Sequence, residues 1–186
     1  RNLGFTDNTS LFVFTYDWRK KLTDLADTLN TYITTKIPTG TKVNIVGHSL
    51  GGLVGRIYVQ KYGTSRINTL ITVGSPHQGI PQAYKAFAGG EFFRDYSLEW
   101  LAMKIIFILN RSSGQTDRSV VADRLPVTQD LLPIYDFLKR ADGSFIDATT
   151  MTYKNDTLLT YKTTFSSIFP VFQSITGEKG TTLLGF

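Results

Sequence analysis

The chain contains no cysteine among its 186 residues. This absence excludes a thiol nucleophile, a cysteine-ligated zinc or iron–sulfur site and a disulfide framework. Histidine is also scarce, with two residues, and the sequence has neither an HExxH pair nor a glycine-rich phosphate loop, so we expect no metal and no cofactor. Apolar material is plentiful: 41% of the residues are hydrophobic, including 13 Phe, which is enough for one globular core.

Charge of one sign is not concentrated anywhere. The 20 basic and 15 acidic residues give a net charge of +5, and the densest basic run, Arg19-Lys20-Lys21, is three residues long. A nucleic-acid-binding protein is expected to gather Lys and Arg on one element. We therefore predict no nucleic-acid partner and interpret the basic run as an exposed helix start.

Long hydrophobic runs are missing as well. No apolar run reaches the length required to span a bilayer, and no signal peptide is recognisable at the start. Because the first residue is Arg rather than Met, and a strand pattern follows within about ten residues, we expect the natural N-terminus to lie upstream. The sequence therefore leaves the compartment open.

Three short apolar runs, 11–16, 43–46 and 69–73, have the length and the branched and aromatic content of strands buried in a sheet. The segments between them, 19–37 and 53–63, repeat apolar residues at helical spacing and end at glycine or proline. Alternation of strands and helices is typical of a parallel sheet with crossover helices. The predicted fold class is therefore α/β, with residues 1–79 as its core.

Residues 80–157 break this alternation. They combine short helical pieces with glycine-rich turns and contain no clear strand, which we interpret as an insertion over one edge of the sheet, with a separate small domain as the alternative. Within them, residues 98–109 are apolar almost all round, so this helix is expected to be buried, to cover an apolar cavity, or to contact a lipid surface or a partner. Residues 158–186 are expected to return to the core, with a strand near 171–176.

The glycine-rich segment 47–52, GHSLGG, connects the second predicted strand to the second predicted helix. It matches the G-x-S-x-G nucleophile elbow in the strand-to-helix context that this motif requires. Glycines allow a sharp turn that holds Ser49 in a strained backbone conformation. We predict Ser49 as the nucleophile and the Leu50 amide as an oxyanion donor, with a structural turn serine as the alternative. The other predicted elbow residues are Gly47, His48 and Gly51.

Neither histidine has the position expected of a general base. His48 lies inside the elbow, where its side chain is expected to leave on a different side from Ser49. His77 follows the third predicted strand at the same edge of the sheet, so we include it as a pocket candidate. A hydrogen-bonded histidine within a structural turn is the favoured interpretation of His77.

Together with the elbow, three further segments resemble the α/β-hydrolase superfamily. They are YDWR at 16–19, GSPHQG at 74–79 and DLLP at 130–133, and within the superfamily they are most similar to lipases and acyltransferases of the lecithin:cholesterol acyltransferase-like group. The resemblance implies a lipid or other carboxylic ester substrate and an acyl-Ser49 intermediate. It also implies that residues 80–157 act as a lid or cap.

In that lid, Trp100 and Phe107 of the apolar helix are candidates for contact with a lipid surface. The resemblance is incomplete, however. Enzymes of this kind carry an acid and then a histidine after the nucleophile, and no histidine follows His77. The aspartates of residues 80–157 are expected to be helix caps or surface carboxylates.

We therefore interpret the chain as part of a larger serine lipase or esterase, truncated at both ends and lacking the acid and histidine of the triad. Alone, it is expected to have little or no turnover. Two alternatives stay open: an acyltransferase of the same group that moves the acyl group to an alcohol, and a non-catalytic binding module built on a hydrolase scaffold.

Overall fold

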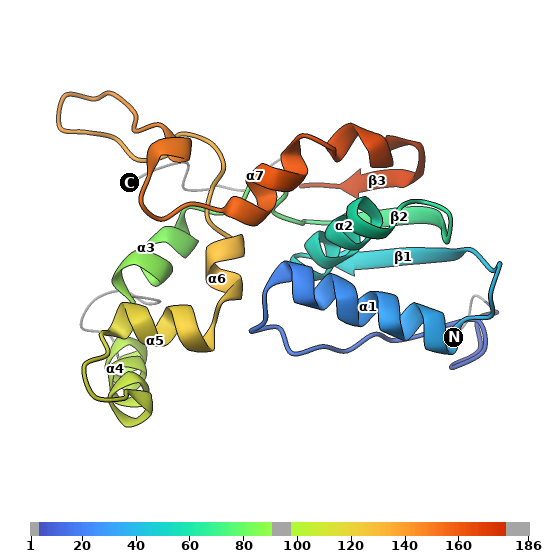
Figure 1. The fold of residues 1–186 in the computed structure, drawn as a ribbon, viewed down its shortest axis with the longest axis horizontal. Coiled ribbons are helices and arrows are strands. Elements are labelled where there is room, and N and C mark those ends of the chain that lie inside the picture. The colour runs from blue at the N-terminus through green and yellow to red at the C-terminus, as the bar shows by residue number, and fades with distance from the viewer. Residues whose placement is uncertain (1–3, 91–97, 178–186) are drawn as a thin grey trace.

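The computed structural model describes residues 4–90 and 98–177, with the backbone alone at residues 98–101 and 103. In Figure 1, α1 and α2 lie against a small sheet, and α3 to α6 gather beside that unit. The elements in chain order are α1 (Leu22–Lys36), β1 (Val43–His48), α2 (Leu50–Tyr62), β2 (Ile67–Val73), α3 (Gln82–Gly89), α4 (Leu98–Asn110), α5 (Asp117–Arg124), α6 (Val127–Asp130), η1 (Ala148–Thr150), α7 (Asp156–Lys162), η2 (Phe165–Val171) and β3 (Phe172–Ile175).

The sheet of the described residues has three parallel strands in the order β1-β2-β3. In the ladder between β1 and β2, His48 pairs with Val73, and in the ladder between β2 and β3, Val73 pairs with Ile175. The carboxyl ends of the three strands therefore lie side by side. The elbow follows β1 there, and the loop after β2 begins beside it. These strands confirm the predicted α/β class, the predicted strands at 43–46 and 69–73, and the predicted late strand near 171–176.

The helices α1 and α2 cover one face of this sheet because each presents an apolar stripe to it. Gly55 permits the close approach of α2, since a Cβ there would lie 2.8 Å from Leu70 Cδ1 and 3.3 Å from Ile45 Cγ2. On the opposite face, β1 exposes alternate residues, among them Val46, which is 67% exposed. The buried hydrophobic residues of the two helices are Leu22, Leu25, Ala26, Leu29 and Ile33 of α1 and Leu53, Val54, Ile57, Tyr58 and Val59 of α2.

The N-terminus of α1 is capped from a distant part of the chain. Lys21 precedes the helix and supplies no capping side chain, whereas Oδ2 of the buried Asp130 accepts a hydrogen bond from the Leu22 amide at 2.7 Å. The fully buried Asn155 donates to the main-chain oxygens of Asp130 and Leu132 at 2.6 and 2.9 Å. Burial raises the pKa of Asp130. Asp130 of α6 is therefore a buried cap of α1, and its bond with Asn155 connects both helices to the start of α7.

The predicted strand at 11–16 was wrong. The segment is extended, and Phe12, Phe14 and Tyr16 pack against the core, but Val13 is 72% exposed and the structure assigns no strand here. The phenol of Tyr32 in α1 donates to the Val13 carbonyl at 3.2 Å. A strand requires a neighbour that completes its hydrogen bonds, and none of the described strands pairs with this segment.

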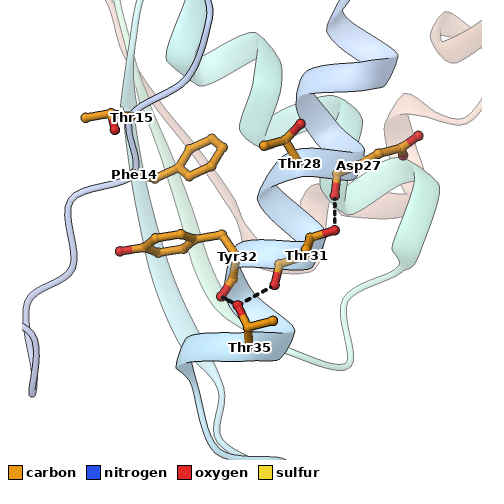
Figure 2. Close-up of a pocket in the computed structure, with 7 residues that line it drawn as sticks. All are labelled: Phe14, Thr15, Asp27, Thr28, Thr31, Tyr32 and Thr35. Carbon is orange, nitrogen blue, oxygen red and sulfur yellow. Dashed lines mark hydrogen bonds between the residues drawn. The ribbon is translucent and has the colours of Figure 1, made fainter.

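A hollow of about 530 Å³ remains between this extended segment and α1 (Figure 2). Its helical wall carries Thr31 and Thr35, whose hydroxyls donate to the main-chain oxygens of Asp27 and Thr31 in their own helix, as the dashed lines show. Because these hydroxyl protons are already used, and none of the lining residues is a predicted site residue, we assign no ligand to this hollow.

The helices of residues 80–157 form a second apolar cluster. Phe87 of α3, Phe107 of α4, Val121 of α5 and Leu132 are all buried in it. Asp117 at the start of α5 forms ion pairs with Lys104 and Arg111 and so fixes the end of α4 to α5. The remaining face of α4 is open, with Ile105, Ile106, Ile108 and Leu109 between 47% and 77% exposed.

The predicted apolar helix is thus present, and it is buried along one side only. Among the described residues, no helix has both the length and the apolar character needed to cross a membrane.

Candidate active site

The turn between β1 and α2 places Ser49 in an uncommon backbone conformation. Its φ is +50° and its ψ is −120°, and Asn8 is the other described non-glycine residue with positive φ. The Ser49 amide donates to the carbonyl of Val73 at 2.9 Å, which continues the pairing of β1 with β2 into the turn. A serine held in this region stores backbone strain, and such strain is concentrated at functional sites.

Two of the glycines near Ser49 stand where a larger residue would not fit. A Cβ on Gly47 would lie 2.5 Å from the main-chain carbon and oxygen of Gly51, and a Cβ on Gly52 would lie 1.9 Å from the hydroxyl of Ser75. A Cβ on Gly51 would meet the hydroxyl of Tyr16 at 3.4 Å, an ordinary contact. The elbow is therefore packed tightly against its own first helical turn and against the loop after β2, and Tyr16 of the YDWR segment reaches it from the extended segment.

The electrostatic setting of Ser49 favours negative charge nearby. Leu50 is the first residue of α2, so its amide has no acceptor within the helix and lies at the positive end of the helix dipole. The Ser49 side chain is half-buried, and its hydroxyl has no hydrogen-bond partner in the part of the chain that the structure describes. The turn therefore places a serine hydroxyl next in the chain to a helix N-terminal amide, two of the groups that acyl transfer uses.

His48 ends β1 with an exposed side chain. Its Nε2 would lie 4.0 Å from a Cβ on Gly74, so the ring is near the loop after β2. No hydrogen bond joins the ring to Ser49 among the described residues.

His77 belongs to the loop after β2, and its ring lies among aromatic side chains. Its Nε2 is 3.0 Å from the hydroxyl of Thr72, and its ring packs against Phe165 and Phe172 at centroid distances of 5.9 and 5.4 Å. Its Nδ1 is buried and has no partner among the described residues. Burial and the nearby Arg56 cation lower the pKa of His77 to about 4, so the ring is neutral at physiological pH. It has no described hydrogen bond to Ser49.

Arg56, which is 1% exposed on the apolar side of α2, was not among the residues predicted from the sequence. Its Nη1 donates to the main-chain oxygen of His77 at 2.8 Å, its Nε donates to Gln60, and its guanidinium carbon lies 4.1 Å from the ring centre of Phe165. Burial lowers the pKa of this guanidinium to about 10. The sequence does contain a signal for this residue, because an arginine stands within the apolar helical stripe Leu53, Val54, Ile57 and Tyr58.

The motif segments 74–79 and 130–133 are joined through their backbones. Ile80 donates to the Leu131 carbonyl at 2.8 Å, and Ile134 donates to the Gln78 carbonyl at 3.0 Å. Gly79 has a φ of +80°, and a Cβ there would lie 2.1 Å from the Leu132 carbonyl oxygen. The two segments therefore form one unit that fixes the loop beside the elbow.

The two lid candidates differ in what the structure describes. Phe107 is 3% exposed and packs inside the second cluster rather than facing solvent. The backbone of Trp100 belongs to α4, and its side chain lies outside the described residues.

Residues for a cofactor or a complete triad are not brought together in the described ranges 4–90 and 98–177. They contain no group of three or more metal-ligating side chains. The buried carboxylate of Asp130 is used as the cap of α1. The site as described is a strained serine with an adjacent helix N-terminus.

A parallel sheet with crossover helices and a sharp turn into α2 define an α/β-hydrolase fold. The sequence profile of the lecithin:cholesterol acyltransferase family matches residues 1–179, and the chain belongs to this family.

Individual relatives match smaller parts. Over 50 residues the chain is 38% identical to the GPI inositol-deacylase of Coccidioides immitis (strain RS), which covers 26% of this chain and 4% of that protein. Among solved structures, the Tle4-Tli4 complex has a TM-score of 0.47 at 17% identity and covers 75% of this chain and 33% of that chain. The mature Bacillus licheniformis lipase BlEst2 has a TM-score of 0.30 at 22% identity and covers 54% of this chain and 45% of that chain. The chain thus spans less than half the length of each of them.

Proposed function

We propose that this chain carries the nucleophile of a serine lipase or esterase and that Ser49 attacks carboxylic or lipid esters. The observation that carries the proposal is the backbone of Ser49, with φ +50° between the last residue of β1 and the first of α2. A non-glycine residue holds this conformation only where the surrounding structure enforces it. Membership of the lecithin:cholesterol acyltransferase family supports a lipid ester as substrate.

The proposed reaction begins when the Ser49 hydroxyl oxygen attacks the ester carbonyl. A bond forms between Oγ and the carbonyl carbon, the hydroxyl proton passes to a base, and the oxyanion accepts a hydrogen bond from the Leu50 amide. The bond to the leaving alcohol then breaks, and the alcohol takes the proton from the base. Water hydrolyses the acyl-Ser49 intermediate and restores the hydroxyl.

The base and its orienting acid are proposed to lie in a longer protein of which this chain is a part. His77 is neutral, bonded to Thr72 and enclosed by aromatic rings, and the exposed His48 has no described hydrogen bond to Ser49. β1 pairs only with β2 among the described strands, and residues 11–16 are extended without a partner strand, so both leave backbone groups that a further strand would satisfy.

Residues 80–157 are proposed as the lid or cap over a core made of 1–79 and 158–186. The open side of α4 supports lipid contact, because Ile108 and Leu109 are 64% and 77% exposed and follow the buried Phe107. The variant Ile108→Ser/Leu109→Ser is expected to reduce hydrolysis of aggregated esters more than hydrolysis of dissolved ones. An equal effect on both would remove the lipid-contact proposal.

Transfer of the acyl group to an alcohol instead of water is the second candidate reaction, favoured by the family to which the chain belongs. Addition of a sterol or alcohol to the full-length protein distinguishes the two, because acyl transfer in excess of hydrolysis would identify a transferase. A non-catalytic binding module is the remaining alternative, and it predicts a serine that never reacts.

The decisive experiment is labelling with a fluorophosphonate, read by intact mass. We expect the longest natural protein that contains this chain to be labelled, its Ser49→Ala variant to stay unlabelled, and the 186-residue chain to react slowly or not at all. A Ser75→Ala variant serves as the control, since Ser75 lies beside the elbow on the loop after β2. If Ser49→Ala is labelled as fast as the natural protein, Ser49 is not the nucleophile.

A further inference from the structure

Arg56 of α2 is a buried cation without a carboxylate beside it. The side chain is 1% exposed, and no ion-pair partner meets it in the part of the chain that the structure describes. Its hydrogen bonds go to neutral acceptors, the His77 carbonyl at 2.8 Å and the Gln60 side-chain oxygen at 2.9 Å, and the ring of Phe165 lies against the guanidinium. Burial of a charge without an opposite charge is costly, and a neutral side chain at this position would avoid that cost.

Neutral partners hold this cation in place but do not cancel its charge at a distance. Burial lowers the pKa of the Arg56 guanidinium only to about 10, so the group stays protonated at physiological pH. Its field reaches neighbouring groups, since burial and then the Arg56 cation lower the pKa of His77 to about 4. The charge therefore acts on what surrounds the loop after β2.

Arg56 belongs to the helix that begins at the elbow. It follows Ser49 by seven positions, about two helical turns, so its Cα lies roughly 10 Å along the axis from the start of α2. Helical side chains lean toward the N-terminus of their helix, and the guanidinium reaches the His77 carbonyl in the loop after β2. The same loop contacts the elbow, because a Cβ on Gly52 would lie 1.9 Å from the Ser75 hydroxyl. The cation is therefore part of the unit that packs around the elbow.

We propose that the uncompensated charge of Arg56 stabilises the oxyanion that forms when Ser49 attacks an ester, an inference that rests on the proposed function. The Leu50 amide and the positive end of the α2 dipole act on the same negative charge. At an effective dielectric constant of about 20, a unit charge roughly 10 Å away changes a rate by about tenfold. The ester is neutral before the attack, so the charge of Arg56 accelerates the reaction without tightening substrate binding.

The test compares variants that change the charge with variants that change only the contacts. Arg56→Met removes the cation, whereas Arg56→Lys keeps a cation and loses part of the hydrogen bonding. Gln60→Glu places a carboxylate at the oxygen that accepts from Arg56 Nε, and Gln60→Met leaves the cation uncompensated. Both Gln60 variants lose the bonds that Nε2 donates to the Tyr161 carbonyl and the Thr164 hydroxyl. Within each pair, the charge differs while lost contacts are shared.

The measurements use the longest natural protein that contains this chain. Fluorophosphonate labelling gives the limiting rate constant at saturating reagent, and ester hydrolysis gives kcat and KM. We expect Arg56→Met to lower the limiting rate constant and kcat about tenfold and Gln60→Glu to lower them at least about threefold, with KM unchanged. Arg56→Lys and Gln60→Met are expected to stay within about twofold of the natural protein. Thermal unfolding identifies the folded variants, and the pair at the half-buried Gln60 decides the case if the Arg56 variants do not fold.

Equal rates in Gln60→Glu and Gln60→Met would overturn the inference, because the rate would then follow contacts and not charge. A higher KM with unchanged kcat would overturn it too, since the effect would lie in binding. The proposed function fails by a different result: the natural protein is not labelled, or Ser49→Ala is labelled as fast, and this inference then falls with it. Labelling at Ser49 at one rate in all four variants overturns this inference alone.

Discussion

Arg56 Nη1 donates a hydrogen bond of 2.8 Å to the main-chain oxygen of His77, and so connects the helix that follows Ser49 to the loop that follows β2. This arginine is 1% exposed, and its second described partner is Gln60 rather than a carboxylate. The buried cation is stabilised by neutral oxygens and by the ring of Phe165. Its loss leaves the His77 carbonyl without this donor.

The first prediction concerns that contact. The variant Arg56→Met keeps most of the side-chain volume but removes both hydrogen bonds, so we expect the free energy of unfolding to fall by about 2 kcal/mol. Urea denaturation measures this change. Lys36→Met, at an exposed position, is the control and is expected to stay within about 0.5 kcal/mol of the natural chain. Equal stability of the two variants would contradict the prediction.

The second prediction concerns the glycines of the elbow, which differ in what surrounds them. Gly47→Ala places a Cβ 2.5 Å from the backbone of Gly51, which no rotamer change relieves, and we expect a loss of several kcal/mol or failure to fold. Gly51→Ala meets the Tyr16 hydroxyl at 3.4 Å and gains helix propensity, so its stability is expected to change by less than about 1 kcal/mol. Thermal unfolding of the two variants gives the comparison.

The third prediction uses Gly52, where the obstacle is a side chain. Gly52→Ala would place a Cβ 1.9 Å from the Ser75 hydroxyl and is expected to cost about 1–3 kcal/mol. Adding Ser75→Gly removes the nearest atoms, so the double variant should recover part of the loss. Gly177→Ala, which meets nothing within 4 Å, is the control. A double variant that is less stable than the sum of its single changes would argue against the described contact.

The fourth prediction concerns the cap of α1. Asp130→Ala removes the acceptor of the Leu22 amide and the hydrogen bond with Thr157, and is expected to lower the free energy of unfolding by about 1–3 kcal/mol. Asp130→Asn keeps an oxygen that can accept from the amide, so its loss should be smaller. Asp24→Ala, an exposed change in the first turn of the same helix, controls for lost charge. Denaturant unfolding checks this order: Asp130→Asn should lower the free energy of unfolding less than Asp130→Ala does.

The fifth prediction concerns pH. The pKa of His77 is lowered from its usual 6.5 to about 4, so between these values the unfolded chain binds a proton that the folded chain does not. Stability is therefore expected to fall as the pH decreases from 6.5 toward 4. The variant His77→Gln should show a shallower decrease in this window, whereas His48→Gln should retain the contribution of His77. Because burial raises the pKa of Asp130, that carboxyl acts with the opposite sign, and the comparison between variants isolates His77.

The sequence predicted the parts of the fold whose signals are local. Helical spacing and the stops at Pro38 and Gly63 located α1 and α2, and the GHSLGG segment located the strained turn at Ser49. The prediction of a strand at 11–16 was wrong for a physical reason. The composition of this run is that of a strand, but a strand also needs a partner, and composition does not reveal one. The role of Arg56 was missed, and Asp130 was expected as a helix cap or a surface carboxylate without its burial or the helix that it caps, because each depends on a contact with a residue far away in the chain.

The cap of α1 also affects the order in which the protein can fold. Asp130 follows Leu22 by 108 positions, so at roughly 5–20 residues per second of synthesis the first turn of α1 waits on the order of 5–20 s for its acceptor. β2 waits for a similar time, because Phe172 of β3 follows its partner Leu70 by 102 positions. During this interval the nascent sheet has an unpaired apolar edge, and contacts of such long range slow folding. A newly made chain therefore passes through a period in which the unpaired edge of β2 can pair with another chain.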